Sequence, residues 1–169
     1  SNLRQLARQR MDEHGWTCEC IRCREVGMND ADPDGTELDV HTYEAAGGTE
    51  HFVSIEDFES DLLVGFCRLR FPGDPADGTA ESLRSELEDA AVVRELHVYG
   101  SEVAVGDAGG EDHQHQGYGR RLLAEAERLA AEAGFGKLSV ISGIGAREYY
   151  REKLGYYQDG PYVSTRLDR

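Results

Sequence analysis

The sequence has no long hydrophobic run. No stretch reaches the roughly 18 consecutive apolar residues that a membrane-spanning helix needs, and no basic segment followed by an apolar one opens the chain. We therefore expect a soluble, cytoplasmic protein with no membrane partner. The 169 residues are within the usual size of one domain, long enough to bury a core without disulfides.

Positive charge is scarce, because 18 lysines and arginines face 33 acidic residues and give a net charge of -15. Such a charge opposes the electrostatic attraction on which most nucleic-acid binders depend. The acidic residues concentrate in segments 30–39, 56–61 and 81–89, which is typical of a solvated surface adapted to high salt. In that setting the net charge says little about partners.

Cysteine is also scarce, and three of the four cysteines lie within six residues, which does not indicate a disulfide framework. Cys18, Cys20 and Cys23 form a Cys-x-Cys-x2-Cys motif that can bring three thiolates around one soft ion such as zinc. Three ligands are one short of a tetrahedral set. The alternative is a group of three reduced, partly buried thiols. The candidates for a fourth ligand are Cys67, His14, His51, another residue folded nearby, or one outside this chain.

The residue pattern changes near residue 91. Before it, an amphipathic helix over 3–14 is followed by three β-rich segments separated by turns, which predicts an antiparallel meander over 37–46, 49–55 and 61–70. After it, strand and helix signals alternate twice, which requires a partly parallel sheet. The predicted elements are strand 91–99, helix 117–133, strand 137–142, helix 146–154 and closing strands within 156–166. The fold class is a mixed α/β (α+β) layer.

A glycine-bearing segment precedes the predicted helix 117–133. It reads Gln114-His115-Gln116-Gly117-Tyr118-Gly119 and fits the pattern Gln/Arg-x-x-Gly-x-Gly/Ala. The first turn of a helix has unpaired backbone N–H groups and a partial positive charge, so a pyrophosphate can bind there. The glycines allow close approach, and Arg120 and Arg121 add cationic donors. We predict a phosphate-binding helix start; the alternative is a glycine-rich turn without a ligand.

Two other phosphate-binding motifs do not fit this segment. A Rossmann site needs a third glycine and an acidic residue about 20 positions on, at the end of a second strand, and both are missing. A Walker loop needs Gly-Lys-Ser/Thr, which is also missing.

Several motifs together resemble the GNAT acyltransferase family, and within it the C-terminal acetyltransferase domain of the Elongator catalytic subunit family. The resemblance covers nearly the whole chain. It implies a GNAT fold, with a mixed, mostly antiparallel sheet flanked by helices over 28–169 and a helix with a zinc knuckle over 1–27. The motifs are Cys23-Arg24-Glu25-Val26-Gly27, Arg94-Glu95-Leu96-His97-Val98-Tyr99-Gly100, segment 114–119, Ser139-Val140-Ile141-Ser142-Gly143-Ile144-Gly145-Ala146-Arg147-Glu148-Tyr149-Tyr150, and Leu154-Gly155-Tyr156 with Gly160-Pro161-Tyr162.

The resemblance implies a tRNA-modifying enzyme that forms 5-carboxymethyluridine at the wobble position from acetyl-CoA. That family uses a radical S-adenosylmethionine domain together with the GNAT domain. No Cys-x3-Cys-x2-Cys motif is present in this chain, so the [4Fe-4S] cluster and S-adenosylmethionine are expected only in an upstream domain. The resemblance therefore implies acetyl-CoA, the upstream domain and, through the full-length protein, tRNA as partners, and it supports zinc at the cysteine motif.

The resemblance also implies roles for individual residues. The acetyl-CoA contacts would come from the strand that splays before the phosphate segment and from that segment itself: Glu95, Leu96, His97, Val98, Gln114, Gln116, Gly117, Tyr118, Gly119 and Arg120. Glu95 is also a candidate catalytic residue, or a structural one. Tyr149 and Tyr150 are adjacent on a helix and point about 100° apart, so one can line the core while the other faces the thioester. A phenol there can hydrogen-bond the thioester or protonate the departing thiolate as a general acid, so both tyrosines are catalytic candidates. The resemblance favours Tyr150 as the acetyl-CoA contact, with Tyr149 as its partner; two core aromatics are the alternative.

Two other functions stay open. One is a stand-alone protein or small-amine N-acetyltransferase, in which Glu95 serves as base. The other is a module that binds acetyl-CoA without turnover. A tRNA-binding role needs local basic surface, for which the candidates are the N-terminal arginines Arg4, Arg8, Arg10, Arg22 and Arg24, or these are simply a solvated face.

Overall fold

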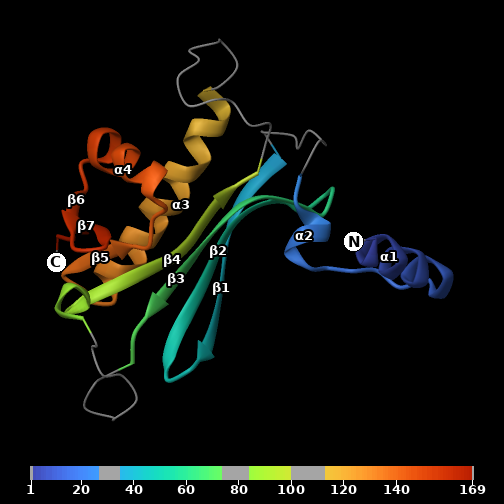
Figure 1. Cartoon of the computed structure of the whole chain (residues 1–169), viewed down its shortest axis with the longest axis horizontal. Helices are drawn as coiled ribbons and strands as arrows, with labels where there is room; N and C mark the ends of the chain where they lie inside the picture. The colour runs from blue at the N-terminus through green and yellow to red at the C-terminus, as the bar shows by residue number, and fades with distance from the viewer. Residues whose placement is uncertain (1, 27–34, 74–83, 100–112, 169) are drawn as a thin grey trace.

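The computed structural model describes residues 2–26, 35–73, 84–99 and 113–168 (Figure 1). The strands are β1 (Thr36–Ala45), β2 (Gly48–Asp57), β3 (Leu62–Phe71), β4 (Ala90–Val98), β5 (Lys137–Val140), β6 (Tyr157–Asp159) and β7 (Tyr162–Arg166). The helices are α1 (Leu3–His14), α2 (Ile21–Arg24), α3 (His113–Glu132) and α4 (Arg147–Leu154), with single 3₁₀ turns η3 (Ser85–Leu87) and η4 (Ile144–Ala146).

All these strands form one sheet in the order β1-β2-β3-β4-β5-β7-β6. The β4–β5 pair is parallel and every other pair is antiparallel. The connection between the two parallel strands runs through α3, as a parallel crossover requires. The predicted meander and the mixed α/β sheet are therefore confirmed.

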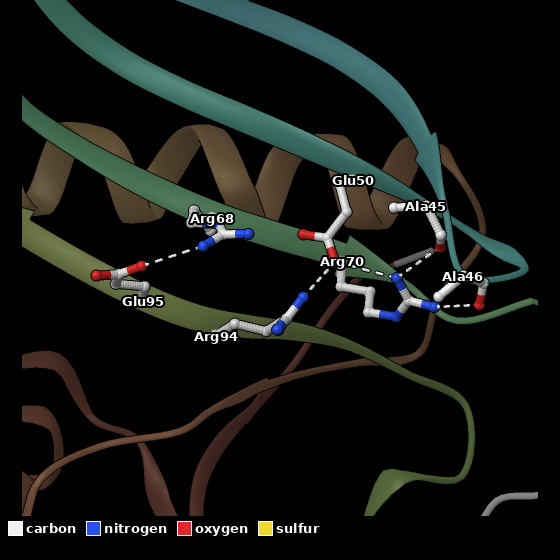
Figure 2. A network of polar contacts seen from close by, with 7 residues as sticks. All are labelled: Ala45, Ala46, Glu50, Arg68, Arg70, Arg94 and Glu95. Atoms are coloured by element: carbon white, nitrogen blue, oxygen red, sulfur yellow. Dashed lines mark hydrogen bonds and ion pairs between the residues drawn. The ribbon is translucent and has the colours of Figure 1, made fainter. Parts of the chain in front are cut away.

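The β1–β2 hairpin turns at Ala46 and Gly47, which both have positive φ, 46° and 71°. Two such residues in a two-residue loop match the twist of the strands, although a residue with a Cβ is uncommon there. Arg70 holds this turn by donating hydrogen bonds to the carbonyl oxygens of Ala45 and Ala46, at 3.0 and 2.9 Å (Figure 2). The arginine thus stabilises the bend that starts the meander.

The core lies between α3 and one face of the sheet. Leu122, Ala126 and Ala130 recur at helical spacing on α3, and each is fully buried against the middle strands. The strands contribute alternate residues such as Val53 on β2 and Leu69 on β3, because successive side chains of a strand point to opposite faces. α4 packs at the β6–β7 end of the sheet (Figure 1).

The N-terminal helix α1 lies apart from the sheet (Figure 1). None of its residues is buried, and its predicted apolar face is open, with Leu3 72% exposed and Leu6 52% exposed. Gly15 ends the helix in a left-handed conformation, as predicted, with φ 65°. No helix in the described part of the chain is both long and apolar enough to cross a membrane.

The start of α3 differs from the prediction. The helix begins at His113, four residues before Gly117, so Gln114, His115 and Gln116 are part of the helix and not of a loop. Glycine costs about 1 kcal/mol inside a helix, which made Gly117 look like a boundary. The buried leucines and alanines of α3 offset that cost.

Candidate functional site

The two parallel strands of the sheet separate along their length. Residues 90–93 of β4 pair with 137–140 of β5, and one further bond follows, from the Ile141 N–H to the Val93 carbonyl at 2.9 Å. Among the described residues no strand pairs with β4 on this side beyond Val93, although β4 continues to Val98. The expected splay is therefore present. It leaves backbone groups of residues 94–98 turned toward a gap, where a ligand can pair with them.

A β-bulge redirects the side chains of β4 at the point where the splay begins. The register with β3 shifts between Arg68 and Leu69, which makes Arg94 the extra residue. Leu96 and Val98 follow the bulge and pack against the core beneath α3. Glu95 and His97 point to the opposite face of the sheet.

Glu95 takes part in a short chain of charged groups on that face. Its two carboxylate oxygens lie 3.5 Å from Arg68 Nη1 and 3.2 Å from His97 Nε2. Figure 2 shows the Arg68–Glu95 pair on the side of the sheet away from α3. The His97 ring packs beside Phe66 and Tyr99, with centroids 5.4 and 6.2 Å away. Glu95 is thus held as a half-buried carboxylate between two possible cations.

The two adjacent tyrosines of α4 diverge, as predicted from their spacing, but the buried one is Tyr150. It is 6% exposed, whereas Tyr149 is 41% exposed. Burial, the buried Cys67 and Tyr149 together raise the pKa of Tyr150 to about 12. Tyr150 is part of the same core cluster as Cys67 and the buried residues of α3, so it lies on the α3 side of the sheet. Tyr150 and Glu95 therefore belong to opposite faces of the sheet.

Tyr156 is a buried neighbour of Tyr150 to which the sequence assigned no function. Its hydroxyl donates a hydrogen bond to Glu127 Oε1 of α3 at 2.6 Å, and its ring centroid lies 5.7 Å from that of Tyr150. Burial and the bond to Glu127 raise the pKa of Tyr156, so the phenol stays protonated. Helical periodicity in the sequence predicts that Glu127 is on α3. It cannot predict that Glu127 accepts a hydrogen bond from a residue in a loop.

The glycine segment of α3 lies next to the end of β4. A Cβ added at Gly119 would meet Val98 Cγ2 at 3.7 Å, while nothing lies within 4 Å of one added at Gly117. Tyr118 is buried in the core, so only its backbone is available to a ligand. Arg120 is exposed, and Arg121 lies over the Tyr118 ring at 5.9 Å.

The earlier start of α3 changes where Arg120 and Arg121 lie relative to the helix N-terminus. Because the helix begins at His113, Arg120 and Arg121 are its eighth and ninth residues. The partial positive charge of the helix dipole acts mainly on the first turn, so it neither repels these two arginines nor indicates a ligand beside them. The side chains of Gln114 and Gln116 lie outside the described structure, and their predicted contacts stay predictions.

The three cysteines of the N-terminal motif come together. The Sγ atoms of Cys18, Cys20 and Cys23 all lie within 4.8 Å of one another. Hydrogen bonds from Cys18 and Cys23 lower the pKa of the Cys20 thiol to about 7. Three convergent sulfurs, one of them readily ionised, fit a soft cation such as zinc.

None of the three candidates for a fourth ligand joins this group of described residues. Cys67 is buried in the core, where burial raises the pKa of its thiol to about 12. His14 contacts the Arg10 carbonyl and stacks on Trp16, and His51 contacts Thr42 on β1. The cysteines therefore meet without any of these residues.

The N-terminal arginines do not form the expected basic surface as a set. Arg24 is only 21% exposed at its side chain and is paired with Glu56 and with Asp61, the latter at 2.7 Å. Arg10 lies 3.6 Å from Glu13. Arg24 instead ties the segment after the cysteines to the β2–β3 hairpin, and Val26 continues this contact with an N–H bond to the Leu63 carbonyl at 3.0 Å.

A second polar network lies on the same sheet face as Glu95. Glu50 of β2 is 1% exposed, and its Oε1 accepts hydrogen bonds from Arg70 at 3.0 Å and from Arg94 at 2.6 Å (Figure 2). Its Oε2 has no hydrogen-bond partner in the described structure. Burial raises the pKa of Glu50, but the two arginines outweigh this effect and the pKa is lowered. The network fixes the bulge residue Arg94, a function that the sequence did not reveal.

Three features together define an acyltransferase fold. The parallel strands β4 and β5 separate, β4 carries a bulge, and the glycine turn of α3 lies next to the end of β4. Residues 19–156 match the model of the acetyltransferase (GNAT) family, and the chain belongs to that family. It is 47% identical over 173 residues to Elongator complex protein 3 of Drosophila melanogaster. It is 46% identical over 176 residues to a tRNA uridine(34) acetyltransferase of Methanocaldococcus infernus.

Each alignment covers 99% of this chain but only 30% and 32% of the respective relatives, whose C-terminal region it matches. The solved structure of Methanocaldococcus infernus Elp3 with an N-terminal deletion is similar over 99% of this chain, with a TM-score of 0.81 and 44% identity. This chain covers 39% of that one. The predicted fold and family resemblance are thus confirmed.

Proposed function

We propose that this chain is the acetyl-CoA-binding acyltransferase domain of a radical S-adenosylmethionine enzyme that forms 5-carboxymethyluridine at the wobble position of tRNA. The observation that carries the proposal is the separation of β4 from β5, with Tyr150 in the core on the α3 face of the sheet and Glu95 on the other face. The relatives named for tRNA uridine(34) and for Elongator supply the substrate class.

In this proposal the backbone of residues 95–98 pairs with the pantetheine arm, since these groups face the gap and not a strand. The pyrophosphate lies beside the second turn of α3, next to the end of β4, where Gly117 and Gly119 carry no side chain. Arg120 supplies a cation from the exposed face of the helix. The contacts to the pantetheine arm, to the pyrophosphate and from Arg120 thus follow one another from β4 to α3.

Tyr150 acts as the general acid that protonates the departing thiolate. Its pKa of about 12 keeps the phenol protonated at neutral pH, so it can donate a proton or a hydrogen bond. Glu95 accepts a proton from the water that attacks the thioester carbonyl, the C–S bond breaks, and Tyr150 protonates the CoA thiolate, which leaves acetate and CoA. Arg68 and His97 orient the Glu95 carboxylate.

Two further components are part of the proposal. Cys18, Cys20 and Cys23 hold a structural zinc ion whose fourth ligand lies outside the group described above. The radical chemistry, with its [4Fe-4S] cluster and S-adenosylmethionine, belongs to an upstream domain, consistent with the 30% and 32% of the two relatives that this chain spans.

The test compares wild type with Tyr150→Phe and Tyr149→Phe. Acetyl-CoA affinity is measured by calorimetry on this chain, and tRNA-stimulated thioester hydrolysis on a polypeptide that joins it to the upstream domain. We expect Tyr150→Phe to reduce hydrolysis at least about tenfold, since one acid-base group typically contributes 10²–10⁴-fold. Wild-type affinity and wild-type hydrolysis in Tyr150→Phe would overturn the assignment.

The same preparation separates the other two functions. Acetylation of a protein or small amine, without any effect of tRNA, would support the N-acetyltransferase, for which the half-exposed carboxylate of Glu95 is a suitable base. Acetyl-CoA binding with neither reaction would support a non-catalytic module.

A further inference from the structure

The tyrosine that the proposed function uses as its acid packs against a partly buried pair of side chains. Tyr156 and Glu127 come from the α4–β6 connection and from the middle of α3 and are joined by the 2.6 Å hydrogen bond. Within the described part of the chain, Glu125 and Glu132 of the same helix pair with Arg128, whereas Glu127 receives a phenol. A carboxylate turned toward the core needs such a donor, because an unpaired one is costly to bury.

Tyr156 is joined to Tyr150 at two points. Its backbone N–H donates to the Tyr150 carbonyl at 3.1 Å, across Gly155, which ends α4 in a left-handed conformation with φ 75°. Its ring lies against the Tyr150 ring, with centroids 5.7 Å apart and planes tilted by 48°. The hydrogen bond to Glu127 of α3 fixes the far end of the Tyr156 side chain, which gives the Tyr150 ring an anchored surface to pack against.

Two other described neighbours of Tyr150 offer a weaker restraint. Tyr149 contacts it edge-on, with centroids 5.9 Å apart, but is itself 41% exposed. Cys67 is buried on β3 and is too short to fix a ring by itself.

We propose that Glu127 and Tyr156 are positioning residues that hold the Tyr150 phenol at the gap between β4 and β5 in the orientation needed to protonate the thiolate. This inference rests on the proposed function of Tyr150. Glu127 anchors Tyr156 to α3, Tyr156 packs against Tyr150, and neither touches the thioester. A general acid acts only when its hydroxyl is within hydrogen-bond reach of the leaving atom, so a loosened ring loses rate before it loses binding.

The experiment is a double-mutant cycle on hydrolysis of acetyl-CoA in the polypeptide with its upstream domain, using Tyr150→Phe, Tyr156→Phe and the double variant. We expect Tyr156→Phe to lower kcat about tenfold with KM for acetyl-CoA within about twofold, and to have no further effect when Tyr150 is already Phe. Equal losses in both backgrounds would show a general structural effect and would overturn the proposal.

Conservative variants and a control sharpen the result. Glu127→Gln keeps an oxygen acceptor for the phenol and should retain most of kcat, whereas Glu127→Leu should match Tyr156→Phe. Tyr157→Phe, at an exposed neighbouring tyrosine, should behave as wild type. Thermal unfolding of each variant identifies any that fails to fold, and Glu127→Leu still tests the pair, against Glu127→Gln, if Tyr156→Phe is among them.

The outcomes separate the two proposals. If Tyr150→Phe keeps wild-type hydrolysis, the acid is wrong and the positioning pair is overturned with it. If Tyr150→Phe is slow while Tyr156→Phe and Glu127→Leu are as fast as wild type, the acid stands and only the positioning pair is wrong.

Discussion

Among the charged residues that the structure describes, Glu50 is the most buried. It is on β2 and accepts a hydrogen bond from Arg94 of β4, the strand that carries the candidate site. Its carboxylate holds Arg94 at the bulge and Arg70 at the β1–β2 turn. Removing one member of a buried ion pair typically costs about 3–5 kcal/mol, because the partner charge is left uncompensated. Through these two arginines, Glu50 links the β1–β2 turn to the β4 bulge, and the bulge sets the sheet face to which the Glu95 side chain points.

The first prediction concerns the stability of Glu50→Gln against pH. The pKa of Glu50 in the folded protein is below its ordinary value of 4.5. Its ionisation therefore stabilises the fold above about pH 4.5, and this contribution is lost as pH falls through the folded pKa. Urea unfolding should show a gap of about 3 kcal/mol between wild type and Glu50→Gln near pH 7 that narrows below about pH 4.5. A matched Glu37→Gln variant on exposed β1 should show a small gap at every pH; a constant Glu50 gap would contradict the prediction.

At the scale of elements, periodicity alone predicted the meander, the parallel crossover and the closing hairpin. Strand alternation and the leucine and alanine spacing of α3 are local signals, so they could be interpreted without tertiary contacts. Three features could not be predicted in this way: the bulge at Arg94, the Arg24 pairing and the Glu127–Tyr156 bond. Each joins residues more than 20 positions apart, and no spacing rule reports such contacts.

The start of α3 shows a different limit. Glycines at 117 and 119 weaken a helix, and propensity placed the boundary there. The observed start at His113 puts the glycines in the second turn, next to β4. The position of this glycine turn beside the end of β4 is thus a better basis for predicting its function than the low helix propensity of its glycines.

The second prediction tests the cationic part of this turn. Arg120→Gln should weaken acetyl-CoA binding about tenfold at low salt, because one exposed guanidinium near a pyrophosphate is lost. Added salt screens the same interaction, so the difference from wild type should shrink toward high ionic strength. Titration calorimetry at two salt concentrations measures both. Arg128→Gln, further along the helix and paired with Glu125 and Glu132, is the control and should bind as wild type.

The third prediction concerns the cysteine element. Purification without chelators should yield about one zinc ion per chain, and Cys20→Ser should lose it. Because the cysteines precede the Arg24 and Val26 contacts with the hairpin, metal loss should make residues 15–26 more sensitive to limited proteolysis. Cys67→Ala serves as the control, since that thiol lies in the core and should leave the zinc content unchanged. Wild-type protein free of zinc would overturn the site.

At the scale of the whole molecule, 33 acidic residues against 18 basic ones make self-repulsion a property of the entire surface. Several of the described arginines are already paired with acidic groups, as Arg24, Arg70 and Arg94 each pair with a carboxylate. Binding to a polyanion is therefore expected to rely on the upstream domain, with this chain contributing the thioester chemistry.

The fourth prediction follows from this charge. Raising KCl from about 0.1 to about 2 M should raise the thermal midpoint by roughly 5 °C, because salt screens repulsion between like charges. A variant with several exposed acids of β1 changed to amides should begin with a higher midpoint and gain less from salt. Differential scanning calorimetry measures both, and an equal gain in the two proteins would contradict the electrostatic explanation.

The gap between β4 and β5 has a mechanical consequence. Among the described residues, the backbone bonds that join the β1–β4 half of the sheet to the β5–β7 half come from residues 90–93 and 137–140, with one bond beyond them. A cofactor bound along β4 would act as a surrogate strand and continue the backbone bonding between the two halves. We expect the amide protons of β4 and β5 to exchange more slowly when acetyl-CoA is bound, so that the ligand also stabilises the sheet.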